Sequence, residues 1–137
     1  MEKYAIDSYV FLDLFLHSQQ EETARKKFHK ALQSKAVISS IALLEVKYQV
    51  MRKLSHEKAE EATFTMRNMD NVEIINVSPE IAETAADIRA KYYKKNEREL
   101  SYADAIHIAT AITAGCTVII TGDRDFERIE ELKAEIY

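Results

Sequence analysis

Four acidic residues stand where strands and helices of the chain are expected to meet: Asp7, Glu45, Asp104 and Asp123. In a parallel α/β fold, such positions lie at one edge of the sheet, beyond the carboxyl ends of the strands. Carboxylates gathered there would repel one another unless a cation lay between them. Mg²⁺ and Mn²⁺ prefer oxygen ligands, and a bound ion can activate water and stabilise charge on a phosphoryl oxygen. The four residues therefore indicate hydrolysis of phosphodiester bonds.

Three of the four also have an ordinary structural explanation. Asp7 could cap a helix, and Asp104 forms with Ser101 the S-x-x-D pattern of a capping box. Asp123 follows a glycine, as Asp often does in a tight turn, and Asp125 has the same explanation. Taken singly, these residues do not establish a site.

Glu45 is harder to explain structurally, because it is the only charged residue in the apolar run 41–46. It shares a helical stripe with Ile41, Leu44 and Tyr48. An unpaired buried carboxylate is strongly disfavoured, so Glu45 is expected to be neutral, paired with a cation or bound to a metal ion. No Lys or Arg precedes it by three or four positions, although an Arg distant in sequence could pair with it.

Short apolar segments alternate with amphipathic ones along the chain. Strands are expected at 3–6, 36–38, 72–77 and 117–120, with a last edge strand at 135–137. Helices are expected at 9–16, 21–33, 56–69 and 102–114, from Ile41 and Pro79 onward, and as a short segment after Phe126. Such alternation implies right-handed βαβ units. The expected fold is a three-layer α/β/α domain around a mostly parallel sheet of four or five strands.

The helix expected at 102–114 has the clearest periodicity. Ala105, Ile108 and Ile112 fall on one buried face, and Gly115 follows where a left-handed stop residue is expected. The β-branched residues 117–120, which follow this helix, show no alternation with polar residues, as expected of a strand covered on both faces. This segment thus joins two of the four acidic positions.

Composition limits the class of protein. The 137 residues are 47% hydrophobic with one Pro and two Gly, as expected of one compact domain spanning 1–137. No apolar run is long enough to span a membrane and the N-terminus lacks a signal-peptide pattern, so a soluble cytoplasmic protein is expected. The lone Cys116 lacks the spacing of a zinc site and is expected in the core. The net charge of −4 argues against binding nucleic acid through a global positive field.

Four blocks of the sequence resemble, in order, the signature blocks of PIN-domain ribonucleases. The blocks are residues 7–8 (DS), 40–46 (SIALLEV), 103–111 (ADAIHIATA) and 121–126 (TGDRDF). The chain is most similar to the VapC-type toxins of prokaryotic toxin–antitoxin pairs. A single block is a weak motif, whereas the ordered set, which extends over the whole chain, is specific.

The resemblance implies a metal-dependent endoribonuclease in which Asp7, Glu45, Asp104 and Asp123 are the catalytic residues and hold one or two Mg²⁺ or Mn²⁺ ions. Asp125 would be a further ligand or a supporting group, and Asp123 is preferred over it. Hydrolysis by a metal-activated water would leave a 5′-phosphate and a 3′-hydroxyl.

Other positions of the blocks match or depart from the family pattern. Ser8 and Thr121 match small hydroxyl residues that support the acidic cluster. Tyr9 departs from the pattern, because relatives often have Asn there. His107 stands one helical turn after Asp104, and the resemblance implies packing or support of the ligands for it rather than a role as catalytic base.

The resemblance also implies an RNA substrate, a homodimer, and a small antitoxin whose tail covers the acidic groove. Without the four site carboxylates, 19 acidic residues would balance the 19 basic ones, which weakens the objection from net charge. Basic and aromatic residues before Asp104 could contact phosphates and stack bases. They are Lys91, Lys94, Lys95 and Arg98, with Tyr92 and Tyr93. The structural alternative is a solvated helix end favoured by the helix dipole.

Two other functions fit part of the pattern. A receiver-like or catalytically silent domain could bind metal and a partner in the acidic pocket without turnover. Receivers, however, need an acceptor Asp at the end of a central strand, and Ser78 and Pro79 follow the third strand here. A haloacid-dehalogenase-type phosphatase needs D-x-D after the first strand, whereas this chain has Asp7, Ser8 and Tyr9.

Overall fold

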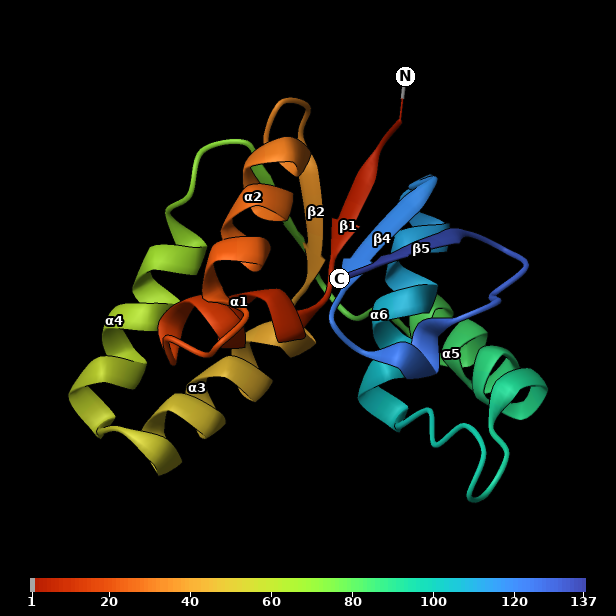
Figure 1. The fold of residues 1–137 in the computed structure, drawn as a ribbon. Coiled ribbons are helices and arrows are strands. Elements are labelled where there is room, and N and C mark those ends of the chain that lie inside the picture. Colours follow the sequence, from red (N-terminus) through yellow and green to blue (C-terminus); the bar gives the residue numbers. More distant parts are fainter. Residues whose placement is uncertain (1) are drawn as a thin grey trace.

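A five-stranded parallel sheet with helices on both faces makes up the fold of residues 2–137, which the computed structural model describes (Figure 1). The strands lie in the order β3-β2-β1-β4-β5, and each neighbouring pair is parallel. Their bounds are β1 Tyr4–Ile6, β2 Ala36–Ser39, β3 Val72–Ile75, β4 Val118–Thr121 and β5 Lys133–Ile136. The three-layer α/β/α fold expected from the sequence is confirmed.

The helices divide between the two faces of the sheet. Their bounds are α1 Ser8–Phe15, α2 Glu21–Ala31, α3 Ile41–Lys53, α4 His56–Arg67, α5 Pro79–Tyr92 and α6 Tyr102–Thr113, with a 3₁₀ turn, η1, at Arg124–Phe126. Helices α1 to α4 share one hydrophobic core with the sheet, and α5 and α6 share a second core with its other face (Figure 1). No helix in residues 2–137 combines the length and apolar composition needed to cross a bilayer.

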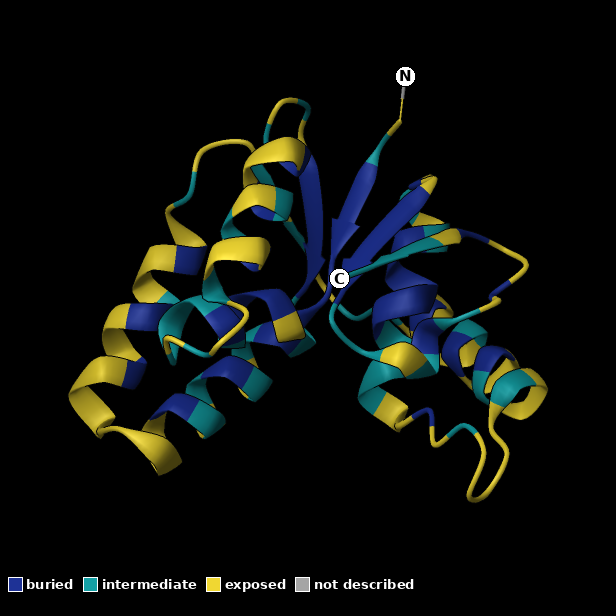
Figure 2. Cartoon of the chain, in the orientation of Figure 1, coloured by how far each residue is buried: buried dark blue, intermediate teal, exposed yellow. Residues whose placement is uncertain are grey.

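The strands contribute to both cores, which explains their lack of polar alternation. In β1, Tyr4 and Ile6 pack into the core under α1 to α4, whereas Ala5 packs into the core under α5 and α6. The central strands are buried along their length while the outer faces of the helices are exposed (Figure 2). A sheet covered on both sides is rigid, and its strand ends provide fixed points for a site.

The expected bounds agree with the observed ones to within two residues, apart from the short helix expected after Phe126. That expectation is wrong, because the helical turn η1 ends at Phe126 and the following segment is irregular. Arg128 has a φ of 56°, in the left-handed region, which interrupts a right-handed helix. Cys116 is a buried core residue, as expected.

Gly115 ends α6 in the manner expected from the sequence. Its φ is +75°, and the amides of Gly115 and Cys116 donate to the carbonyls of Ile112 and Ala111 at 3.0 and 2.9 Å. These bonds satisfy carbonyls at the helix end that would otherwise lack partners. The left-handed conformation turns the chain back towards β4.

We expect Gly115→Ala to lower the free energy of unfolding by about 1 kcal/mol, because an L-residue is disfavoured in the left-handed region. No atom lies within 4 Å of an added Cβ, so the cost is conformational and not steric. Gly115→Asn should lose less, since Asn tolerates this region better. Urea unfolding of the three proteins measures the difference, and an alanine variant as stable as the wild type would contradict it.

Candidate active site

Asp7 lies where β1 ends beside β4. Ile6 pairs with Ile120 in the sheet, and the amide of Asp7 donates to the carbonyl of Ile120 at 3.0 Å. The hydroxyl of Thr121 then donates to Oδ2 of Asp7 at 2.7 Å. Asp7 precedes α1 but makes no side-chain capping bond, so the capping explanation for this residue is wrong. Its carboxylate is directed to the end of the sheet instead.

The environment of Asp7 disfavours its charged form. The residue is only 2% exposed, and burial raises the pKa of its carboxyl group. His107 and the Thr121 hydrogen bond act in the opposite direction, while the charges of Glu45 and Asp123 raise the pKa further. The net direction is upward, chiefly because of burial, with a smaller contribution from the neighbouring carboxylates.

Asp104 forms the capping box that the sequence indicates. Ser101 accepts from the amide of Asp104, and Oδ2 of Asp104 accepts from the amide of Ser101, both at 3.0 Å. Burial, followed by the charges of Asp7 and Asp123, raises the pKa of Asp104 to about 6 against the lowering effect of the Ser101 bonds. Within residues 2–137, Oδ1 of Asp104 makes no hydrogen bond, so this oxygen is free to bind a ligand.

Glu45 finds its partner in His107, a residue 62 positions away in α6. Nε2 of His107 lies 2.6 Å from Oε1 of Glu45 and 3.5 Å from Oδ1 of Asp7. The expectation that Glu45 needs a cation or a ligand is therefore met by an imidazole rather than by an Arg. His107 links α3, α6 and the end of β1.

His107 is buried, and burial alone would disfavour its charged form. The hydrogen bond to Glu45 and the charges of Asp7, Glu45 and Asp104 outweigh burial, so the pKa of His107 is raised. Its Nδ1 is a buried atom without a hydrogen-bond partner in the described part of the chain. The ring supports two of the acidic residues, in keeping with the supporting role expected from the sequence.

Asp123 and Asp125 differ in where their charges act. Oδ1 of Asp123 accepts from the amide of Asp125 at 2.8 Å, and the amide of Asp123 donates to Thr121 Oγ1 at 3.0 Å. The charge of Asp123 raises the pKa of both Asp7 and Asp104. Asp125 instead shares a shallow pocket with Asn96, Glu97 and Glu99. The geometry favours Asp123 as the member of the acidic cluster.

Ser8 and Tyr9 border the cluster in different ways. The Ser8 hydroxyl is 3.5 Å from Oδ1 of Asp7, a long and weak contact. The Tyr9 ring lies so close to Gly122 that an added Cβ would be 2.5 Å from it. Burial and the charges of Asp13, Asp123 and Asp7 raise the pKa of Tyr9. Tyr9 therefore lies beside the acidic cluster, and it lines a groove together with Glu45.

The donor chemistry of the cluster fits a hard divalent cation, because the four neighbouring acidic side chains offer only oxygen ligands. The raised pKa values of Asp7 and Asp104 show that positive charge would be favoured between them. As placed in residues 2–137, however, no three His, Cys, Asp or Glu side chains form a complete metal-binding group. The chemistry of the donors fits, and their present arrangement is not a finished coordination sphere.

A groove of about 710 Å³ lies between α1 and α3, and Glu45 is the member of the acidic cluster that lines it. Tyr9 and Glu45 lie in its wall together with Leu44, Tyr48 and Arg52. Leu44 and Tyr48 are exposed apolar side chains. Such a surface is typical of a site covered by another molecule.

The basic cluster expected to contact RNA is largely used within the protein. Lys91 pairs with Glu130 and Glu131 at 3.2 and 3.0 Å, and Tyr92 donates to the same Glu131. Lys94 pairs with Glu97 at 3.3 Å. For these side chains the structural alternative, a solvated helix end, agrees better with the contacts.

Asp13 is a buried acidic residue that sequence reasoning missed. Its oxygens accept from the Ser18 and Tyr137 hydroxyls, each at 2.6 Å. These bonds tie the end of the chain to α1 beside the groove. The signal was present, because Asp13 stands alone among apolar residues just as Glu45 does.

Solved structures with the same fold include VapC toxins and complexes that contain them. One is the sarcin–ricin-loop-cleaving toxin VapC20 of Mycobacterium tuberculosis, 21% identical, with a TM-score of 0.77 over 90% of this chain and 92% of that one. DNA-bound VapBC of Salmonella typhimurium is 24% identical, with a TM-score of 0.73 over 99% and 98%. A toxin–antitoxin complex of Klebsiella pneumoniae is 26% identical, with a TM-score of 0.68 over 95% of each chain.

Sequence comparison gives the family. A search of curated protein sequences found no significant match. The family model described as PIN domain matches residues 4–132, a range that includes Asp7, Glu45, Asp104 and Asp123. The resemblance expected from the four blocks is thereby confirmed, and the chain belongs to the PIN domain family.

Proposed function

We propose that this protein is an endoribonuclease that requires Mg²⁺ or Mn²⁺ and acts in the cytoplasm as the toxin of a VapBC-type toxin–antitoxin pair. Membership of the PIN domain family and the likeness to VapC toxins support this proposal. The observation that carries it is the convergence of acidic side chains at the carboxyl ends of β1 and β4, where burial and mutual repulsion raise the pKa of Asp7 and Asp104.

The four acidic residues share one role in this proposal. Asp7, Glu45, Asp104 and Asp123 would hold one or two ions. A bound ion would supply a water of lowered pKa and stabilise charge on the phosphoryl oxygen. Binding of the ion would make the cluster less negative, which favours the approach of an RNA phosphate.

Neighbouring groups hold these side chains in place before any ligand arrives. Thr121 donates to one oxygen of Asp7, and the amide of Ser101 holds one oxygen of Asp104. A hydrogen bond between His107 and Glu45 holds the carboxylate of Glu45. Supporting hydrogen bonds of this kind orient metal ligands and reduce the reorganisation needed during reaction.

A protein partner is supported by the exposed apolar side chains of α3 and α4. Leu44, Tyr48 and Phe64 are exposed, although side chains of this kind are usually buried. Leu44 and Tyr48 line the groove that leads to the cluster. An antitoxin that covers this groove would block the site, and a homodimer would cover further apolar surface.

We expect Asp104→Asn to reduce RNA cleavage by more than about 100-fold, because even groups that only support metal ligands contribute about 10- to 100-fold. Asn can still accept the Ser101 amide bond, so the fold should be retained. Cleavage of labelled RNA with Mn²⁺, alongside circular dichroism, measures both effects.

The same assay compares the two aspartates after β4. Asp125→Asn is the matched control for Asp123→Asn and should lose much less activity. Products with a 2′,3′-cyclic phosphate, or cleavage unaffected by a chelator, would refute the mechanism.

Mg²⁺ or Mn²⁺ should raise the thermal stability of the wild-type protein without any RNA present. A ligand that binds only the folded state adds about 2.7 kcal/mol at 100 times its Kd. Asp7→Asn should shrink the shift in Tm, because one ligand and its charge are lost. Chelator should return the wild type to its metal-free Tm. Stabilisation by metal in a protein that never cleaves RNA would favour the alternative of a silent acidic-pocket binding module.

Expression of the chain in a bacterial host should arrest growth, and Asp104→Asn should relieve the arrest. Co-expression of a short open reading frame adjacent to the gene should also restore growth, because an antitoxin would cover the groove. Growth rate and recovery of both proteins in one complex are the measurements. Undisturbed growth with confirmed RNA cleavage in vitro would separate nuclease activity from the toxin role.

A further inference from the structure

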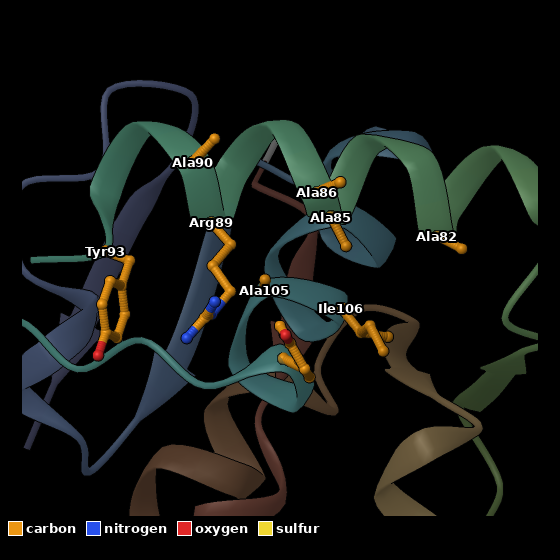
Figure 3. A pocket seen from close by; sticks show the side chains of 9 residues that line it. Ala82, Ala85, Ala86, Arg89, Ala90, Tyr93, Ala105 and Ile106 are labelled. Carbon is orange, nitrogen blue, oxygen red and sulfur yellow. The ribbon is translucent and has the colours of Figure 1, made fainter.

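A second pocket, of about 500 Å³, lies between α5 and α6, away from the groove beside α1 (Figure 3). Alanines of both helices form most of its wall. The large side chains that line it are Arg89, Tyr93, Tyr102 and Ile106. This pocket combines small apolar residues with one cation and two phenol rings.

Arg89 is held between the two rings. Its guanidinium carbon lies 4.2 Å from the ring centre of Tyr93 and 4.4 Å from that of Tyr102, and its Nε donates to the carbonyl of Leu100 at 3.1 Å. Arg89 of α5 and Tyr93, which directly follows this helix, both line the pocket between α5 and α6 (Figure 3). Two cation–π contacts and one hydrogen bond position the guanidinium, and its remaining N–H groups make no hydrogen bond within residues 2–137.

The charge of Arg89 is not neutralised by a carboxylate. Lys91, two residues further along the chain, differs in this respect, since it pairs with Glu130 and Glu131. The guanidinium of Arg89 forms no ion pair with any Asp or Glu of residues 2–137, and its one hydrogen bond there is to the Leu100 carbonyl. A fixed, planar cation of this kind matches the geometry of a phosphate.

Tyr102 has a second ring face that is open to solvent. The residue is 74% exposed, although one face of its ring rests on Arg89. It is the first residue of α6, and Asp104 of the acidic cluster is the third. The two side chains leave the first turn on opposite sides of the helix. A strand of nucleotides that crosses the end of α6 would therefore contact both.

We propose that Tyr102, braced by Arg89, stacks a base of single-stranded RNA that flanks the bond to be cleaved, and that Arg89 contacts a backbone phosphate. The inference rests on the proposed function, because only an RNA substrate would bring a nucleotide to Asp104. Aromatic rings and Arg planes are the usual platforms for unpaired bases. The positive charge of Arg89 would attract the phosphates of the RNA backbone. The pocket is lined by Tyr102 and Ala105, which lie in the same first turn of α6 as Asp104.

Binding of a fluorescein-labelled single-stranded RNA tests the stack. The Asp123→Asn background keeps the RNA intact in the presence of Mg²⁺. In this background, Tyr102→Ala should weaken binding by about 5- to 150-fold, the range for one lost base–aromatic stack. Tyr102→Phe should bind as the parent does, because it keeps the ring. Phe64→Ala, which removes an equally exposed ring from α4 on the other side of the sheet, should have no effect.

A fluorescent reporter separates stacking from charge. The chain has no Trp, so Tyr102→Trp introduces a single indole at the proposed platform. Single-stranded RNA should quench its emission, whereas an abasic ribose-phosphate strand of the same length should not. Equal quenching by both strands, or none by RNA, would overturn the stack. Emission that changes with protein concentration alone would assign the pocket to a second copy of the chain and overturn the RNA assignment.

The two proposals fail separately in these experiments. If the wild type cleaves RNA and Tyr102→Ala binds and cleaves as the wild type does, the stack is wrong and the nuclease stands. If the wild type neither binds nor cleaves RNA with Mn²⁺, the nuclease is wrong and the stack falls with it.

Discussion

The burial of the Asp7 carboxylate at the end of β1 is the constraint on which the rest of the site depends. A buried carboxylate needs hydrogen bonds or positive charge, and Asp7 obtains them from Thr121 of β4 and from the neighbourhood of His107 of α6. Thr121 reaches Asp7 only if β1 and β4 keep their register. His107 reaches it only if α6 keeps its position against the sheet. Loss of a partner would leave the carboxylate buried without compensation, which is the costly outcome.

The site therefore combines buried, mutually repelling carboxylates with a stable framework. Asp7 and Asp104 both have raised pKa values, from burial first and from like charges next. Such an arrangement reduces stability at neutral pH and is retained where a ligand needs it. The strands that carry the site are covered on both faces by apolar cores. This close packing keeps the strands in place although the carboxylates at their ends repel one another.

Features set by neighbours in sequence could be predicted, and features set by packing could not. The Ser101–Asp104 capping box and the left-handed Gly115 follow from local chemistry, and both are present. The loss of a capping role for Asp7 depends on Thr121, 114 residues away in the adjacent strand. The apolar setting of Glu45 indicated that a partner was needed, but its identity depends on how α3 and α6 are rotated against each other.

Charge shows the same limit of sequence reasoning. A count of Lys and Arg treats every cation as equal, whereas the structure separates Lys91, held by two glutamates, from Arg89, which has none. Only cations without a carboxylate partner can neutralise phosphates at little cost, because paired ones must first give up a favourable contact. A protein with a net charge of −4 that neutralises few phosphates should bind RNA with a shallow dependence on salt, and must draw the rest of its affinity from metal and from stacking.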